Sequence, residues 1–341
     1  MSDFDAFKPT LASAAPKLFD LLDRFDRAKI LVVGDLTLDE FLTGQVERLS
    51  REAPVLILRH ESTRQIPGGG GNAIYNFAKL GAKVTAIGLT GKDSQGETLR
   101  QIFTEAGIDG DSIIIDPARP TVTKTRIAGH ARQSVTQQIV RVDRKSDRLP
   151  ILEIQEQLAA AIRRQLETVD AVVFSDYGEG VLTPPVIEAG LTHSRVIVDA
   201  QKDLQRYPKA TLFTPNLPEA EKAVGYGIDE SNLVEAGRDL LNLTEAEAIL
   251  ITRGEDGMTL CDRNLQLQHI PAFNRTDVFD VTGAGDTVVA ALTLALCVGA
   301  SFWEAAVLGN LAASLVVRQF GTATTSVEEM KIALTNLLEE V

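Results

Sequence analysis

One segment of the chain, residues 280–287, has the residue types that can bind an anion. Its sequence is DVTGAGDT, and an apolar, helix-forming run follows it at residues 288–297. Small residues let backbone N–H groups approach an anion closely, and the start of a helix adds the positive end of its dipole. The segment therefore predicts a phosphate cradle at the beginning of a helix.

Asp286 stands at the end of this cradle, where a carboxylate would repel a bound phosphate. A better use for it is to accept a proton from an incoming hydroxyl group, as an aspartate does beside a transferred phosphoryl group. The alternative is a glycine-rich turn in which Asp286 only caps the helix.

Four consecutive glycines, residues 68–71, precede Asn72 and a predicted helix at residues 72–80. Glycines cost backbone entropy, so a run of them is expected where the chain must pass close to a ligand. Asn72 could then bond a hydroxyl group of the ligand, or it could cap the helix. A flexible hinge would have the same sequence.

Asn216 and Glu219 follow a strand-like segment at residues 211–213. Three residues apart, their side chains share one face of a helix and could hold a hydrated Mg²⁺ near phosphates. An asparagine that caps a helix, with glutamate at the third position, has the same spacing.

Short β-branched runs alternate with helical patterns along most of the chain. This alternation predicts an α/β fold with a mostly parallel central sheet and helices on both faces. Ligands bind such sheets beyond the carboxyl ends of the strands. The predicted strands are residues 30–33, 84–89, 171–174, 196–198 and 248–251, and the helices between them are residues 72–80, 152–166, 185–191 and 233–243.

Two regions break the alternation, because each reads as extended β structure without an intervening helix. They are residues 55–61, and the pair 121–128 with 137–143. They predict a small sheet outside the main one, which could cover a pocket or form a dimer surface. No repeat or flexible linker divides the chain. We therefore expect one domain, residues 1–341, with lid strands inserted at about 40–62 and 119–144, and an amphipathic helix at residues 17–26.

Composition narrows the class of protein. The formal net charge of −13 opposes binding to nucleic acid or to an anionic membrane surface. The two cysteines lack metal-ligand spacing. The N-terminal residues lack the apolar core of a signal peptide, and the longest apolar stretch, residues 288–300, is shorter than the roughly 20 residues of a membrane span. A cytoplasmic location is expected.

The order of four elements resembles the PfkB/ribokinase family of sugar kinases over nearly the whole chain. These elements are Gly34 with Asp39, residues 68–72, residues 216–219 and residues 280–286. The resemblance implies a ribokinase-like fold with a β-sheet lid. It also implies ATP and Mg²⁺ as cosubstrates and phosphorylation of a sugar hydroxyl.

The resemblance assigns roles to individual residues. Asp286 would be the base, and the N–H groups of Gly283, Ala284 and Gly285 would form the anion hole. The substrate would contact Asp39, Gly69, Gly70, Asn72, Lys124 and Arg141. The nucleotide would contact Asn216, Thr252, Gly254 and Asn310. Glu219 would act on Mg²⁺ indirectly, while Asp280, Thr282 and Gly321 match positions where some members hold a monovalent cation such as K⁺.

Within this family the chain most resembles the heptose 7-phosphate kinases, which phosphorylate O1 of D-glycero-β-D-manno-heptose 7-phosphate. The matching stretches are SREAPV at 50–55, PTVTK at 120–124, SDY at 175–177, TPNL at 214–217 and GT at 321–322. Residues 121–145 also carry six cationic side chains, Lys124, Arg126, Arg132, Arg141, Arg144 and Lys145, against Asp143 alone. That excess suits a phosphorylated substrate, although a solvated β-ribbon could have the same charges.

The chain departs from those kinases in its expected cations. Glu179 stands where they usually have lysine, and their Asp-Pro-Lys is replaced by DAQ at residues 199–201, with Lys202 displaced by one. The loop at 130–136 also looks longer than usual. A second, nucleotidyltransferase-type domain is not expected.

Other functions remain open. The chain could phosphorylate another sugar or sugar phosphate, such as fructose, ribose or fructose 6-phosphate, or it could be a noncatalytic nucleotide-binding regulator. A dinucleotide-dependent oxidoreductase is not favoured, because no G-x-G-x-x-G follows the first strand. A homodimer through the lid strands is expected, since exposed strand edges seek partners.

Overall fold

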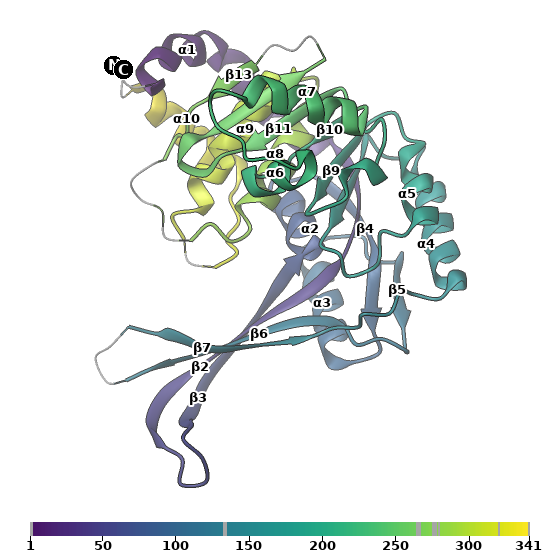
Figure 1. Cartoon of the computed structure of the whole chain (residues 1–341), viewed down its shortest axis with the longest axis vertical. Helices are drawn as coiled ribbons and strands as arrows, with labels where there is room; N and C mark the ends of the chain where they lie inside the picture. The colour runs from purple at the N-terminus through teal and green to yellow at the C-terminus, as the bar shows by residue number, and fades with distance from the viewer. Residues whose placement is uncertain are drawn as a thin grey trace.

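The computed structural model describes residues 3–131, 135–263, 267–274, 278, 280–319 and 321–339. A nine-stranded sheet crosses the body of the molecule in the order β13-β12-β11-β10-β9-β8-β1-β4-β5 (Figure 1). The pairs β11–β12 and β12–β13 are antiparallel, and the others are parallel. The strands are β1 (Lys29–Gly34), β4 (Lys83–Gly91), β5 (Ile113–Asp116), β8 (Ala171–Asp176), β9 (Val196–Ala200), β10 (Leu212–Phe213), β11 (Ala248–Thr252), β12 (Met258–Asp262) and β13 (Leu267–Ile270).

Helices cover both faces of this sheet. Strand β1 shows why, since Ile30 and Val32 enter one hydrophobic core and Leu31 and Val33 enter the other. One core includes α1 (Asp3–Leu22), α2 (Gly70–Lys79), α3 (Ser94–Glu105), α8 (Ala284–Cys297), α9 (Phe302–Val316) and α10 (Val327–Glu339). The other includes α4 (Leu152–Gln165), α5 (Pro184–Leu191), α6 (Leu217–Val224) and α7 (Leu233–Thr244). The predicted α/β architecture is confirmed.

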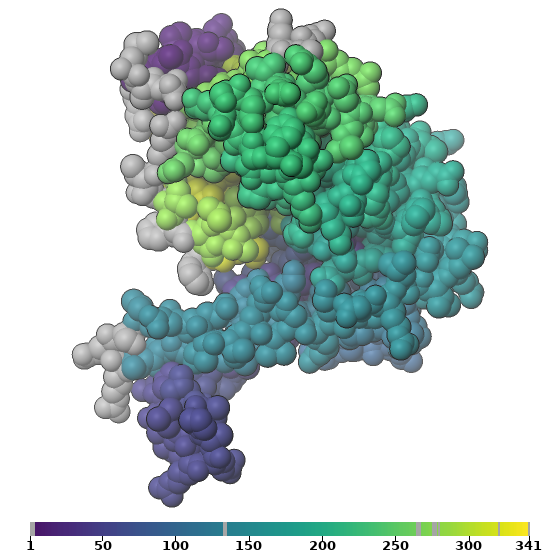
Figure 2. Space-filling view, viewed as in Figure 1, coloured from purple at the N-terminus to yellow at the C-terminus, as the bar shows by residue number. Residues whose placement is uncertain are grey.

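A second sheet of four strands, called the small sheet below, projects from the body (Figures 1 and 2). Its order is β3-β2-β6-β7, with β2 (Leu36–Leu49), β3 (Leu56–Gly69), β6 (Val122–His130) and β7 (Gln137–Arg144). Strand β2 begins two residues after β1 ends, and β3 runs directly into α2. The base of the small sheet therefore lies at the carboxyl end of β1, where ligands are expected.

The N-terminal helix is longer than its sequence indicates. We predicted a helix at residues 17–26, but α1 spans Asp3–Leu22 and is followed by a 3₁₀ turn at Phe25–Arg27. Pro9 and Pro16 lie inside α1, and prolines normally argue against a helix interior. Tertiary packing outweighs that cost, because Leu11 and Leu18 are fully buried.

Across the described residues, no helix combines the length and the apolar character needed to cross a membrane.

Candidate active site

Asp286 lies in the first turn of α8, with its carboxylate almost completely buried. The amide of Asn72 donates a hydrogen bond to Oδ2 at 2.7 Å, and the hydroxyl of Tyr177 donates one to Oδ1 at 3.0 Å. Asp286 makes no capping hydrogen bond, because the helix N-cap is Gly283 with φ of 80°. The capping alternative for Asp286 is therefore wrong.

Asn72 is held in place by a buried polar network between α2 and α8. The Asn76 amide donates to the backbone oxygen of Asn72 at 2.9 Å and contacts its Oδ1 at 3.3 Å. The Thr287 hydroxyl in turn donates to Asn76 Oδ1 at 2.9 Å. Asn72 lies inside α2, whose N-cap is Gly69, so Asn72 does not cap this helix. We had not predicted a role for Asn76 or Thr287.

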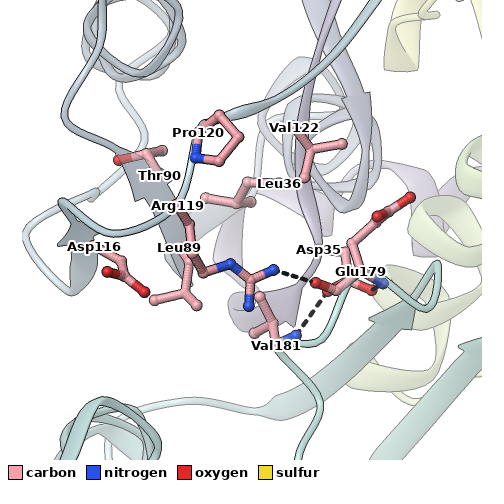
Figure 3. A pocket seen from close by; sticks show the side chains of 10 residues that line it. All are labelled: Asp35, Leu36, Leu89, Thr90, Asp116, Arg119, Pro120, Val122, Glu179 and Val181. Atoms are coloured by element: carbon pink, nitrogen blue, oxygen red, sulfur yellow. Dashed lines mark hydrogen bonds between the residues drawn. The ribbon is translucent and has the colours of Figure 1, made fainter. Parts of the chain in front are cut away.

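Tyr177 is placed by the turn that follows β8. The buried carboxylate of Asp35 accepts backbone hydrogen bonds from Tyr177, Glu179 and Val181 at 2.9–3.0 Å. On the other side of this turn, Arg119 donates to the carbonyl of Glu179 at 2.6 Å (Figure 3). In the sequence, Tyr177 stands in the SDY stretch at 175–177 that resembles the heptose 7-phosphate kinases, but we had not predicted a role for it.

The pKa of Asp286 reflects two opposing effects. Burial raises this pKa, while the hydrogen bonds from Asn72 and Tyr177 lower it, and the result is about 6. The Asp39 carboxylate raises the pKa further, and the Lys124 ammonium lowers it. Burial and the charge of Asp286 raise the pKa of Tyr177 well above its usual value, so Tyr177 is the donor of the pair.

The glycine run passes close to other parts of the protein. A side chain at Gly68 would meet the Asp39 carboxylate at 2.6 Å, and one at Gly69 would meet the Asp35 carbonyl at 2.9 Å. A side chain at Gly70 would meet the backbone nitrogen of Asp35 at 3.0 Å. Close approach is thus the reason for these glycines, but the approached groups belong to the base of the small sheet. Gly69 also has φ of 52°, which favours glycine.

Asn216 and Glu219 form the capping box of α6. The Asn216 side chain accepts from the Glu219 backbone and the Glu219 carboxylate accepts from the Asn216 backbone, both at 2.9 Å. Both residues also line a polar cavity of about 160 Å³, together with Asp176, Tyr177 and Asp199. The capping alternative is confirmed, and it leaves both residues on the wall of this cavity.

The carboxylates of this cavity are suited to a cation. Burial raises the pKa of Asp199, and repulsion from Asp286 and Glu219 raises it further. Burial also raises the pKa of Glu219. A cation would relieve both effects. In the part of the chain that the structure describes, no three carboxylate, histidine or cysteine side chains are grouped to ligate a metal directly. The carboxylate and amide oxygens that line the cavity suit a cation that keeps part of its water shell.

A larger cavity of about 670 Å³ adjoins this one, since Asn216, Thr252 and Gly285 line both. Gly254 and Asn310 also line the larger cavity, together with apolar residues such as Val288. Asn310 is buried and donates to the Pro271 carbonyl at 2.7 Å. The structure thus gathers the four residues that we expected around a nucleotide.

Gly283, Ala284 and Gly285 form the turn into α8. Gly283 is in the left-handed conformation, and a side chain there would meet the Asn72 amide at 2.6 Å. Gly285 has open space where a side chain would project. The start of α8 thus faces the two cavities through Ala284 and Gly285.

Asp280 ties two segments together. Its Oδ1 accepts from the Thr282 backbone at 2.9 Å, and its Oδ2 accepts from the Gly321 backbone at 3.0 Å. Burial acts to raise the pKa of Asp280, but the hydrogen bonds from Thr282 and Gly321 outweigh burial and lower it. The three residues proposed for a monovalent cation are therefore neighbours.

The cations of the small sheet have different surroundings. Lys124 lies over the ring of Tyr177, with Nζ 5.7 Å from the ring centroid. Arg126 forms an ion pair with Asp39 at 2.9 Å, and Arg141 bonds both oxygens of Asp143 at 2.8 and 2.9 Å. Arg132 lies outside the described residues. Lys124 is thus the predicted substrate-binding cation that lies nearest to Asp286.

Two cations approach the turn at Glu179, where a lysine was expected. The Lys145 ammonium is 3.6 Å from the Glu179 carboxylate. A side chain at Gly178 would meet Lys202 Nζ at 3.5 Å, so Lys202 lies beside the same turn. Positive charge is therefore present next to residue 179, although it comes from other parts of the chain.

Sequence comparisons find curated relatives that match most of this chain. Two curated relatives carry the name bifunctional protein HldE. The protein from Geobacter metallireducens is 43% identical over 308 residues, which are 88% of this chain and 61% of that protein. The protein from Pelobacter propionicus is 41% identical over 319 residues, which are 91% of this chain and 64% of that protein. The chain thus spans less than two thirds of the length of these relatives.

Solved structures share the fold at low sequence identity. Arabidopsis thaliana ribokinase, complexed with ribose and ATP, has a TM-score of 0.68 at 19% identity and matches 92% of this chain and 99% of its own. Escherichia coli phosphofructokinase-2, in complex with fructose-6-phosphate, has a TM-score of 0.74 at 19% identity. The match covers 91% of this chain and 99% of the phosphofructokinase-2 chain. A family model for pfkB family carbohydrate kinases matches residues 27–330. Because this family model matches most of its length, the chain belongs to the pfkB family of carbohydrate kinases.

Proposed function

We propose that this chain is an ATP-dependent sugar kinase in which Asp286 accepts the proton of the attacking sugar hydroxyl. The observation that carries the proposal is the placement of Asp286, which is buried and held by Asn72 and Tyr177. With a pKa of about 6, the carboxylate is mostly ionised at neutral pH and still basic enough to take a proton.

The chain's own groups suit phosphoryl transfer. Such transfer requires an in-line arrangement and stabilisation of charge on the phosphoryl oxygens. The N–H groups of Gly283, Ala284 and Gly285, at the positive end of α8, would bind that charge. Asn72 and Tyr177 would keep the Asp286 carboxylate oriented toward the sugar. A Mg²⁺ ion bound with the nucleotide would neutralise phosphate charge, and Asn216, Glu219 and Asp199 would hold it through water.

The adenine nucleotide would occupy the larger cavity, in contact with Asn216, Thr252, Gly254 and Asn310. Its apolar wall suits a base, and its junction with the acidic cavity suits the phosphates. Asp280, Thr282 and Gly321 would hold a monovalent cation such as K⁺ beside the anion hole.

The sugar would lie between the small sheet and Asp286, with Asp39, Gly69, Gly70 and Asn72 around it. We infer that the sugar substrate is D-glycero-β-D-manno-heptose 7-phosphate and that the enzyme phosphorylates its O1. The relatives named HldE and the cations of the small sheet support this substrate. The chain would act as one domain, with the small sheet as a lid, and would pair through that sheet as a homodimer.

The first test replaces the base. Asp286→Asn should lower turnover by about 100-fold or more, the scale expected for loss of a general base, with little change in the KM for ATP. The assay is ATP consumption with Mg²⁺ and heptose 7-phosphate, with fructose, ribose and fructose 6-phosphate as competing acceptors. Asp229→Asn, an exposed change, is the control. Near-normal turnover of a folded Asp286→Asn enzyme would remove Asp286 from this role.

A further inference from the structure

A third cavity, of about 490 Å³, separates the small sheet from the segments around Asp280 and Gly321. Figure 2 shows the molecule hollowed between the projecting small sheet and the body. Phe41, Arg64 and Arg126 line this cavity from β2, β3 and β6, together with the hydroxyls of Thr43 and Ser62. Asp280, Thr282 and Gly321, the residues proposed to hold a monovalent cation, form its other wall, whereas the proposed proton transfer and nucleotide site lie elsewhere.

Strand register explains why the two arginines meet. Phe41 is paired with Arg64 on one side and with Arg126 on the other, so the three side chains share one face of the small sheet. Both guanidinium groups lie over the Phe41 ring, at 5.0 Å for Arg64 and 5.1 Å for Arg126. Phe41 thus lies between the two arginines, and its ring makes a favourable cation–π contact with each guanidinium group.

The carboxylates near this pair leave one positive charge without a partner. Arg126 is paired with Asp39, whereas Arg64 has no ion pair within the described ranges. Asp280 lines the same cavity, but its two oxygens accept backbone hydrogen bonds from Thr282 and Gly321. Arg64 is therefore the cation that is available to a ligand.

We propose that Arg64 and Arg126, on their Phe41 platform, bind the phosphate group that the sugar substrate already carries. This inference rests on the proposed kinase function. Asp39 and Phe41 point to the same face two residues apart, which is about 7 Å along a strand. A sugar whose reacting hydroxyl is at Asp286 would thus present the opposite end to the arginines. The forked guanidinium group matches phosphate oxygens better than a lysine does.

The assignment differs from the substrate contacts expected from the sequence, which include Lys124 and Arg141 but not Arg64. Lys124 lies near Asp286, at the reacting end of the sugar, and Arg141 is already bonded to Asp143. Arg64 was not selected because it lies on β3, far in sequence from the cationic segment. The subsite would select sugar phosphates over free sugars.

The test compares Arg64→Ala with a matched control, Arg59→Ala. Arg59 lies nearer the start of β3, where it forms a hydrogen bond with Gln45 and an ion pair with Glu47. It does not line the cavity, so its removal changes the net charge by the same amount without changing the cavity. Arg64→Ala should raise the KM for heptose 7-phosphate and weaken its calorimetric binding by about tenfold or more. The KM values for ATP and for unphosphorylated heptose should stay unchanged. The KM of Arg64→Lys for heptose 7-phosphate should lie between those of the wild type and Arg64→Ala.

The outcomes separate the two proposals. If the wild type prefers heptose 7-phosphate to heptose and Arg64→Ala keeps that preference, the subsite is wrong and the kinase function stands. If the wild type phosphorylates only unphosphorylated sugars, the proposed substrate fails and the subsite fails with it. A loss of binding in Arg59→Ala equal to that in Arg64→Ala would also overturn the subsite, because general charge would then explain the effect.

Discussion

At the scale of single residues, Asp286 shows how its surroundings suit a carboxylate to proton transfer. Burial raises the pKa of this carboxylate and disfavours its ionised form, whereas hydrogen bonds to the carboxylate lower the pKa and weaken it as a base. Asn72 and Tyr177 offset the burial and bring the pKa to about 6. The hydroxyl of Tyr177 is thus a tuning group as well as a contact.

Tyr177→Phe removes this hydrogen bond and nothing else of the ring. The Tyr177 bond lowers the pKa of Asp286, so its loss should raise that pKa. In the proposed mechanism the ionised carboxylate is the active form, so the acidic limb of the kcat profile should move to higher pH, by about one unit for one hydrogen bond to a charged group. The fold loss of activity should approach about tenfold below pH 6 and be small above about pH 8.

Tyr226→Phe is the control for this profile. Tyr226 also donates to a carboxylate, that of Asp239 at 2.8 Å, but neither residue lines the cavities described above. Its profile should match the wild type. If Tyr177→Phe lowers kcat by one factor at every pH, Tyr177 only positions Asp286 and does not tune its pKa.

At the scale of elements, the site depends on the contact between α2 and α8. The polar chain from Asp286 through Asn72 and Asn76 to Thr287 crosses that contact without reaching water. The sequence predicted both helices from apolar runs and glycine-rich starts. It could not predict the Asn76–Thr287 bond, since these residues are 211 positions apart and the bond exists only after packing.

Thr287→Val tests the strength of this contact. It should lower the free energy of unfolding by about 1–3 kcal/mol, because the buried Oδ1 of Asn76 loses its donor. Thr293→Val is the matched control on the same helix. Thr293 is equally buried, but its hydroxyl has no partner in the described structure, so its removal should be neutral or stabilising. Urea unfolding measures both, and equal losses would contradict a specific role for the bond.

At the scale of the whole molecule, the order of strands is what joins distant segments into one site. Periodic apolar runs predicted the strands, and the motifs at their ends predicted which residues would face a ligand. Two features could not be predicted from these signals. The prolines of α1 argued against a helix in its first turns, so its start was missed. Strands β2 and β3 also extend to Leu36 and Gly69, at the base of the small sheet, beyond the predicted lid strands. That extension is what brings Asp39 near Asp286.

The small sheet also carries the surface through which we propose that the molecule pairs. Val140 and Val142 alternate along β7 with Arg141, so they lie on the face opposite the arginine cavity, 45% and 52% exposed. An exposed apolar pair on an edge strand favours association with a second copy. Light scattering should therefore give a dimer for the wild type and a monomer for Val142→Lys. Ile332→Lys, a change at an even more exposed residue on α10, should remain dimeric. A wild-type monomer, or a dimeric Val142→Lys protein, would place the interface elsewhere or remove it, and the small sheet would then serve only to cover the sugar.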